Sequence, residues 1–146
     1  MPARAMKDPL SRLPGYALRR AASAMIAELA GRLSEIGLRH TDASALLLIE
    51  ANEDVTASAL GRMLDIQRAN MVPLVGRLEA AGLIEREPID GKSHSLRLTA
   101  RGHARLAEAR AIIDQFEGEL LGRIPAEHRA HLLPALNALW INDKSG

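Results

Sequence analysis

The chain has 146 residues, enough for one domain, and 47% of them are hydrophobic but only 2% aromatic, which favours packed helices rich in Leu, Ile, Val, Met and Ala. It contains no cysteine, which excludes disulfides, Cys-based zinc sites and thiol redox chemistry. The formal net charge of +1 does not by itself indicate a nucleic-acid partner. No apolar run approaches the ~18 residues of a membrane span and the N-terminus lacks a signal-peptide core, so we expect a cytoplasmic protein with no membrane partner.

The N-terminal third of the chain is predicted to be an arm followed by two helices. Residues 1–13 mix Pro, Arg, Lys and Asp without periodicity, so we expect a flexible N-terminal arm. From Pro14 to about Gly37 apolar residues recur every three or four positions, which predicts a long helix. Thr41 is expected to cap a second helix that continues to about Ala51.

Two further helices follow in close succession. Thr56 is expected to cap a helix over residues 57–65, and a tight turn then leads into a helix over residues 67–82. This fourth helix contains Pro73, which normally costs about 3 kcal/mol because it removes a hydrogen bond and clashes with the preceding turn. A reason for tolerating the proline is therefore needed.

A helical wheel gives the fourth helix one apolar face and one slim face. The face predicted to be buried carries Met71, Leu74, Val75 and Leu78. The opposite face carries Ala69, Pro73, Gly76 and Ala80. Such a face allows a helix to approach base edges closely, which would give Pro73 a use as a rigid apolar contact.

Residues 83–98 alternate between apolar and polar side chains and carry Asp90-Gly91, a hairpin-tip signal. Short helices followed by a hairpin are the element order of a winged helix-turn-helix, in which the second helix of the pair enters the major groove. The sequence therefore predicts a mainly α fold with about six helices and a two-stranded β-hairpin wing.

The last two helices are predicted from residues that favour helix starts. Thr99 is expected to cap a fifth helix that runs to about Gly122. Pro125 is expected in the first turn of a sixth helix that ends near Ile141.

Catalytic and metal sites are poorly supported. His128 and His131 sit three residues apart beside Glu127, but a third His and any Cys are missing nearby, so a solvated or interface pair is the favoured interpretation. The chain has no Gly-rich phosphate loop, Gly-x-Ser-x-Gly elbow or His-Glu-x-x-His motif. We therefore expect neither an enzyme nor a cofactor or metal.

The predicted DNA contacts come from the fourth helix and the wing. Arg68 is expected to address guanine and Asn70 adenine, and Val72 and Pro73 to touch thymine methyl groups. The full set from the fourth helix is Gln67, Arg68, Ala69, Asn70, Val72, Pro73 and Arg77. The remaining candidates, mostly for phosphate contact, are Arg62, Lys92, Ser93, His94 and Arg97.

The stretch "ALGRMLDIQRANMVPLVGRLEAAGLIEREPIDGKSHSLRLTARG" resembles the DNA-binding core of the MarR family of bacterial transcriptional regulators. The similarity lies in "RLEAAGLIER", the Asp90-Gly91-Lys92 tip and "LTARG", and the flanking helices also fit. It departs from the family in having Gln67 where Ser or Thr often begins the recognition helix, and in having few arginines at the wing tip.

The resemblance implies a single MarR-like domain over residues 14–146, with a winged helix-turn-helix lobe at 56–103 and dimerisation helices at 14–40 and 104–141. It implies a homodimer on a pseudo-palindromic operator, and a repressor released by a small aromatic or phenolic anion. The implied effector pocket would draw on Tyr16, Arg20, Ser23, Arg39, His40 and Ser44.

A second interpretation stays open at this point. The low net charge and the uncharged recognition face are also compatible with a winged-helix protein-interaction module that has no specific DNA binding. Affinity for duplex DNA distinguishes the two.

Overall fold

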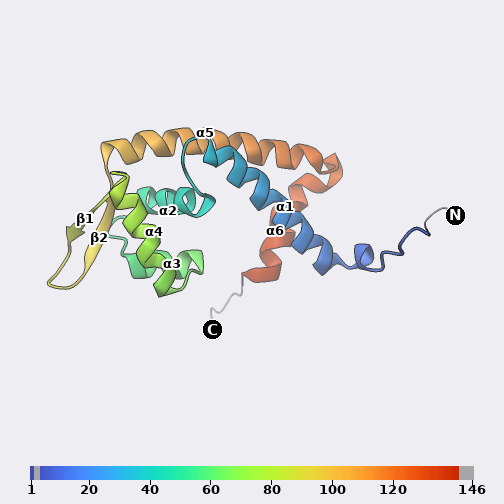
Figure 1. Ribbon diagram of the computed structural model, residues 1–146, viewed down its shortest axis with the longest axis horizontal. Helices are drawn as coiled ribbons and strands as arrows, with labels where there is room; N and C mark the ends of the chain where they lie inside the picture. Colours follow the sequence, from blue (N-terminus) through green and yellow to red (C-terminus); the bar gives the residue numbers. More distant parts are fainter. Residues whose placement is uncertain (2–3, 142–146) are drawn as a thin grey trace. The chain divides into compact units, whose positions relative to one another are not determined.

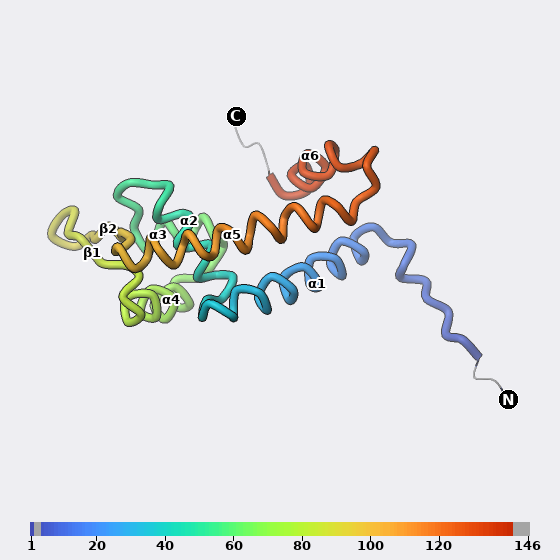
Figure 2. The backbone as a smooth tube through the Cα atoms, turned by 90° about the horizontal axis from the view of Figure 1, so that it is seen from above, coloured from blue at the N-terminus to red at the C-terminus, as the bar shows by residue number. Residues whose placement is uncertain are grey.

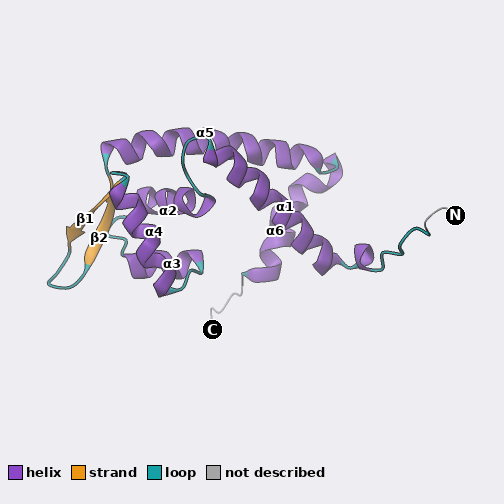
Figure 3. Cartoon of the chain, in the orientation of Figure 1, coloured by secondary structure: helices purple, strands orange, loops and turns teal. Residues whose placement is uncertain are grey.

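The computed structural model describes residue 1 and residues 4–141. The chain falls into two compact units, Met1–Arg110 and Ala111–Gly146. The first unit holds η1 (Leu10–Arg12), α1 (Pro14–Ser34), α2 (His40–Ala51), α3 (Ala57–Leu64), α4 (Arg68–Ala80), β1 (Ile84–Pro88), β2 (His94–Leu98) and the start of α5 (Ala100–Arg123) (Figure 1). The second holds the rest of α5, η2 (Ala126–His128) and α6 (Arg129–Trp140). Across the described residues, the predicted mainly helical fold with one β-hairpin is confirmed (Figure 3).

The predicted N-terminal arm contains one ordered turn. Residues 4–8 have no regular structure, and η1 follows them (Figure 2). The Asp8 carboxylate accepts hydrogen bonds from the backbone amides of Leu10, at 2.9 Å, and Ser11, at 3.3 Å. The arm expected over residues 1–13 thus includes a short helical turn, and its flexibility stays a prediction.

The corner between α1 and α2 differs in detail from the prediction. The helix α1 ends at Ser34, and Gly37 lies beyond it in the left-handed region at φ +74°. The helix α2 begins at His40, and the cap predicted at Thr41 is wrong. Asp42 supplies the capping contact instead, because its carboxylate reaches back to accept a 2.9 Å hydrogen bond from the amide of Arg39.

The pair α3 and α4 packs closely around a glycine. The hydroxyl of Thr56 accepts from the amide of Ala59 at 3.1 Å, so the predicted cap of α3 is confirmed. Asp65 adopts φ 53° and turns the chain into α4. A Cβ atom on Gly61 would come within 2.9 Å of Met71 Cγ and 3.1 Å of the Ile66 carbonyl oxygen, so only glycine permits this helix spacing.

The helix α4 presents the two predicted faces. Met71, Leu74, Val75 and Leu78 are all at most 3% exposed, whereas Pro73 and its neighbours on the opposite face are exposed. Pro73 cannot donate to the carbonyl of Ala69, four residues earlier. Because Ala69 is exposed, water can hydrogen-bond that carbonyl, which reduces the cost of the proline.

The wing is an antiparallel pair tied to the helical lobe. Its register pairs Ile84 with Leu98 and Pro88 with His94. Ile84 and Leu96 are 3% and 2% exposed, and the amide of Leu96 also donates to the carbonyl of Val55 at 2.8 Å. This bond fixes the hairpin to the segment between α2 and α3.

The start of α5 is pressed against the end of α4. The hydroxyl of Thr99 accepts from the amide of Gly102 at 3.0 Å and donates to the carbonyl of Gly82 at 2.5 Å. The predicted cap is therefore confirmed. Gly102 lies so close to Leu83 that a Cβ atom there would overlap the Leu83 carbonyl oxygen.

In the second unit, the sixth helix starts later than predicted. Pro125 precedes the 3₁₀ turn η2 with extended ψ of 138°, and the α-helix begins only at Arg129. Several large apolar side chains of this helix and of the residue after it are exposed in the single chain, namely Leu133, Leu139, Trp140 and Ile141. Over the described part of the chain, no helix is long and apolar enough to cross a membrane.

We expect Gly102→Ala to destabilise the fold by at least about 1–3 kcal/mol, since the new methyl group overlaps a backbone oxygen that cannot rotate away. Urea denaturation followed by circular dichroism measures the change. Gly76→Ala is the matched control, because it sits inside α4 and a methyl group added there would meet nothing within 4 Å. That variant should gain about 0.5–1 kcal/mol of helix stability. Equal stability of the two variants would contradict the contact between α5 and Leu83.

Candidate nucleic-acid interface

The outward face of α4 is open and small. Its predicted members are exposed, namely Gln67, Arg68, Ala69, Asn70, Val72 and Pro73. Val72 is 71% exposed, although it is a large apolar residue. Exposed apolar groups beside an Arg and an Asn form the combination that can read thymine methyls, guanine and adenine in a major groove.

A hollow of about 700 Å³ lies between this face and the wing. It is bounded by the start of α3, the turn into α4, the first half of α4 and the two wing strands. Arg62, Arg68, Arg86 and Lys92 contribute positive charge to its wall, opposed by Asp65. The concavity is therefore basic although the whole chain is nearly neutral.

The structure brings most of the predicted DNA contacts to this hollow. Those that line it are Arg62, Gln67, Arg68, Val72, Lys92, Ser93 and His94. Those that do not are Ala69, Asn70, Pro73, Arg77 and Arg97. Arg86, which also lines the hollow, was missed. It is paired with Leu96 in the hairpin and so lies on the same face of the wing as Ile84, where alternation predicts an apolar side chain.

The exposed cations of the interface have weak partners. The guanidinium of Arg62 donates to the hydroxyl of Ser58 at 3.0 Å. Arg97 pairs with Glu87 at 2.7 Å while both side chains are more than half exposed. Because exposed ion pairs contribute little stability, these guanidinium groups can exchange their partners for phosphates.

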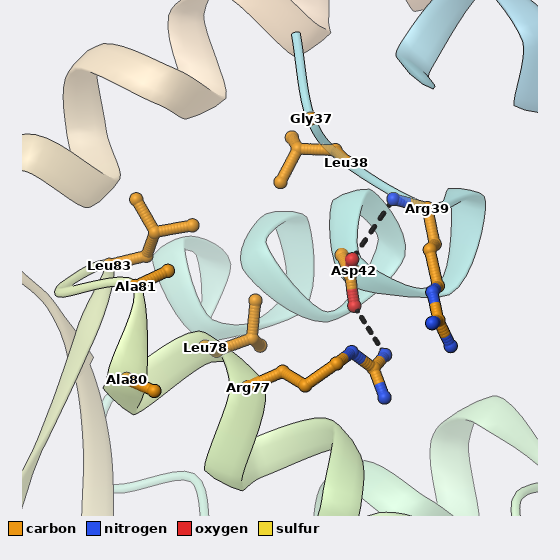
Figure 4. Close-up of a pocket in the computed structure, with 9 residues that line it drawn as sticks. All are labelled: Gly37, Leu38, Arg39, Asp42, Arg77, Leu78, Ala80, Ala81 and Leu83. Carbon is orange, nitrogen blue, oxygen red and sulfur yellow. Dashed lines mark hydrogen bonds and ion pairs between the residues drawn. The ribbon is translucent and has the colours of Figure 1, made fainter.

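Arg77 is placed differently from the other predicted contacts. Its guanidinium donates to Asp42 Oδ1 at 2.8 Å, and the Asp42 side chain is 8% exposed (Figure 4). The pair joins residues 35 positions apart. The position of Arg77 therefore favours a structural role over the predicted DNA contact.

A second hollow of about 410 Å³ lies beside this ion pair. It is lined by Gly37, Leu38, Arg39, Asp42, Arg77, Leu78, Ala80, Ala81 and Leu83 (Figure 4). Of the six predicted effector residues, Arg39 contributes to its wall. The wall combines apolar side chains with two guanidinium groups.

The other predicted effector residues are dispersed over α1 and α2. Tyr16, Arg20 and Ser23 lie on α1, and the guanidinium of Arg19 stands 5.3 Å from the centre of the Tyr16 ring. His40 and Ser44 lie in the first turns of α2, where the Ser44 hydroxyl donates to the His40 carbonyl at 3.0 Å. Neither hollow includes these five residues, so their effector role stays a prediction.

The wing tip is organised by one carboxylate. Asp90 Oδ1 accepts from the amides of Lys92, at 3.0 Å, and Ser93, at 2.9 Å. The Lys92 amide, followed by the Ser93 amide, holds the pKa of Asp90 below its ordinary value. Gly91 is not in the left-handed region, so the carboxylate, rather than a glycine turn, shapes the loop that presents Lys92.

Comparison with known proteins decides the family. A sequence profile described as MarR family matches residues 36–92. The structure of the transcriptional repressor CouR is 32% identical and superposes with a TM-score of 0.80, covering 92% of this chain and 97% of that chain. The chain belongs to the MarR family.

Other MarR structures extend the similarity. CouR bound to a 23-mer DNA duplex is 31% identical with a TM-score of 0.85, covering 94% of this chain and 99% of that chain. CouR bound to p-coumaroyl-CoA is 31% identical with a TM-score of 0.82, over 93% and 97% of the two chains. The HTH-type transcriptional repressor Rv2887 of Mycobacterium tuberculosis is 26% identical over 127 residues, or 86% of this chain and 91% of the relative. Its complex with salicylic acid has a TM-score of 0.70 at 26% identity, over 91% and 97% of the chains.

We expect the carboxyl group of Asp90 to titrate below the ordinary aspartate value of about 3.9, because two backbone amides stabilise its ionised form. The turn then keeps these bonds at neutral pH and loses them as the pH falls through the lowered pKa. The amide shifts of Lys92 and Ser93, followed by NMR against pH, report the midpoint. Asp90→Asn is the control and should abolish the transition. A midpoint at or above the ordinary value would contradict the hydrogen bonds at the wing tip.

Proposed function

We propose that this MarR-family chain is a DNA-binding transcriptional repressor that acts as a homodimer on a pseudo-palindromic operator and is released by a small effector. The observation that carries the proposal is the basic hollow adjoining the exposed, slim face of α4. The DNA-bound structure of CouR supports it, because that repressor shares 31% of its sequence and nearly its whole length with this chain.

The helix α4 enters the major groove with its first two turns. Arg68 has two guanidinium donors for the O6 and N7 acceptors of a guanine, and Asn70 can donate to and accept from an adenine. The methyl groups of Val72 and the ring of Pro73 supply apolar contact for thymine. The small side chains of Ala69 and Gly76 leave room for the helix to approach the bases.

Phosphate contacts hold the helix in the groove. Arg62 of α3 and Arg86 of β1 both line the basic hollow. Lys92, at the wing tip, lines it as well. Each phosphate contact releases counterions, so binding weakens steeply as salt rises.

The effector we propose is an aromatic carboxylic acid or its coenzyme A thioester. The support comes from CouR, which is bound to p-coumaroyl-CoA, and from Rv2887, which is bound to salicylic acid. Arg20 or Arg39 would pair with the carboxylate of a free acid or with a phosphate of a coenzyme A thioester. His40 or Ser44 would hydrogen-bond a ring hydroxyl. Tyr16 and Ser23 would complete the site on α1.

Dimerisation is proposed through the helices that flank the winged helix-turn-helix. The exposed Leu133, Leu139 and Trp140 of α6 are apolar surface that a second copy would cover. Pairing of two chains would also place two copies of α4 on successive turns of one DNA face.

We expect Arg68→Ala and Asn70→Ala each to reduce discrimination between the operator and a scrambled duplex by about 1–3 kcal/mol, because each removes a bidentate base contact. Lys92→Ala should weaken both duplexes alike and reduce the salt slope by about 1. Fluorescence anisotropy with DNA from upstream of the protein's own gene measures both effects. Arg19→Ala, on α1, is the charge-matched control. Wild-type binding no tighter than ~10 µM to every duplex would instead favour the protein-interaction module.

We expect p-coumaroyl-CoA, p-coumarate or salicylate to release the chain from its operator in a mobility-shift titration. Arg39→Ala should raise the concentration needed, because a guanidinium partner of the acid is lost. Lys92→Ala serves as the control, since it weakens DNA binding but should leave ligand affinity in calorimetry unchanged. Failure of all three compounds to release DNA would reject this effector class.

We expect the chain to be a dimer by light scattering at micromolar concentration. Leu139→Asp should shift it toward the monomer, because the carboxylate would be buried without a partner at the proposed interface. Glu117→Asp, an exposed substitution in the second unit, is the control. A monomeric wild-type chain would reject the proposed dimer.

A further inference from the structure

We propose that Asp42 is a positioning residue for DNA reading, which sets the angle of the recognition helix α4 through Arg77. The inference rests on the proposed function, since it concerns how the same helix is held against DNA. The feature that carries it is one buried carboxylate that bonds two different elements, α2 and α4.

Both oxygens of Asp42 are used. Its Oδ2 accepts from the backbone amide of Arg39 at 2.9 Å, and its Oδ1 accepts from Arg77 Nη2 at 2.8 Å (Figure 4). The residue is 5% exposed, so few water molecules can replace either partner. A buried charge that loses a partner is costly, and the carboxylate therefore holds both donors firmly.

The Asp42 end of the pair is fixed by the corner that leads out of α1. Asp42 lies in the first turn of α2, and its bond to the Arg39 amide closes that turn. Leu38, just before Arg39, is 4% exposed, and its amide donates to the Leu33 carbonyl at 3.1 Å. The carboxylate thus projects from a short, tightly bonded corner.

The restraint on Arg77 affects the position of Arg68, because the two residues lie on the same helix. Arg77 lies nine residues beyond Arg68, which corresponds to about 14 Å along a helix axis. A tilt of about 10° at the Arg77 end would move the other end by about 2 Å over that length. That displacement exceeds the tolerance of a base hydrogen bond.

Apolar packing alone does not fix this angle. The buried side chains of α4, such as Leu74 and Leu78, make non-directional contacts. A second polar bond of α4 joins Glu79 to Arg86 of the wing at 2.8 Å, but these side chains are 35% and 46% exposed. Exposed pairs of this kind are weak. In the Asp42–Arg77 pair the guanidinium is 37% exposed but the carboxylate is only 8% exposed, so this bond is the stronger directional restraint.

The proposal predicts a change in operator affinity that is opposite to the change expected from charge alone. Asp42→Asn removes a negative charge near the proposed DNA-binding face, and it leaves one acceptor oxygen for the two donors Arg39 and Arg77. The uncompensated charge of Arg77 should by itself tighten binding to any polyanion. If Asp42 positions α4, the same change weakens operator binding while scrambled duplex is bound equally or more tightly. If Asp42 only stabilised the fold, Asp42→Asn would lower the unfolding temperature. It would not weaken operator binding while leaving the scrambled duplex bound equally or more tightly.

The test uses the full chain, the operator fragment and a scrambled duplex at one salt concentration, with thermal unfolding of each variant measured in parallel. Asp42→Asn should lower the ratio of operator to scrambled affinity by about tenfold, the equivalent of one misplaced base contact. Arg77→Met should do the same, and the double variant should cost no more than Arg77→Met alone. Arg77→Lys, which keeps the charge but lacks the planar fork, should fall between wild type and Arg77→Met.

Glu50→Gln is the matched control. Glu50 is also on α2, its change also removes one negative charge, and it pairs with Arg110 of α5 rather than with α4. The ratio of operator to scrambled affinity of the Glu50→Gln variant should stay within about twofold of wild type, which is less than the effect of one base contact. If Asp42→Asn does not fold, Arg77→Lys and Arg77→Met carry the comparison.

Two failures are distinguishable. A wild-type chain without operator preference rejects the proposed function, and the inference falls with it. A wild-type chain that prefers its operator, together with folded Asp42 and Arg77 variants that keep this preference, overturns the inference alone.

Discussion

Burial of one apolar stripe on α4 is the constraint on which the interface depends. Met71, Leu74, Val75 and Leu78 are all at most 3% exposed, so the helix has a single way to face the core. The opposite side is then necessarily the slim side that carries Pro73. Its proline is tolerated because the carbonyl that loses a donor is on the solvent side. The core and the proposed DNA-reading surface are thus two sides of the same packing arrangement.

Polar bonds add what the apolar stripe cannot supply. Hydrophobic contact resists separation of α4 from the lobe but does little against rotation or tilt. The buried carboxylate of Asp42 restrains the helix through Arg77, and the exposed pair between Glu79 and Arg86 of the wing adds a weaker contact. The bond from Leu96 to Val55 in turn fixes the wing. The helix α4 is therefore held chiefly by α2, whose Asp42 lies 35 positions from Arg77, and less firmly by the neighbouring wing.

Periodicity and local caps were sufficient to predict much of this arrangement. The two faces of α4 follow from its 3.6-residue repeat, and Thr56 and Thr99 cap their helices through contacts three residues away. Contacts between distant segments could not be predicted in this way. The bond between Asp42 and Arg77 spans 35 positions, and its carboxylate also displaced the cap expected at Thr41. The effector residues were drawn from a family resemblance rather than from local pattern, and the structure distributes them over two helices and the corner between them.

The junction at Gly102 has a mechanical consequence. The Leu83 backbone fills the space where any other residue would carry its first carbon atom, and Thr99 is bonded to the segment just before it. The backbone of the first turn of α5 is thus in direct contact with the segment that leads into β1. A displacement of the first turn of α5 would therefore also displace the start of β1.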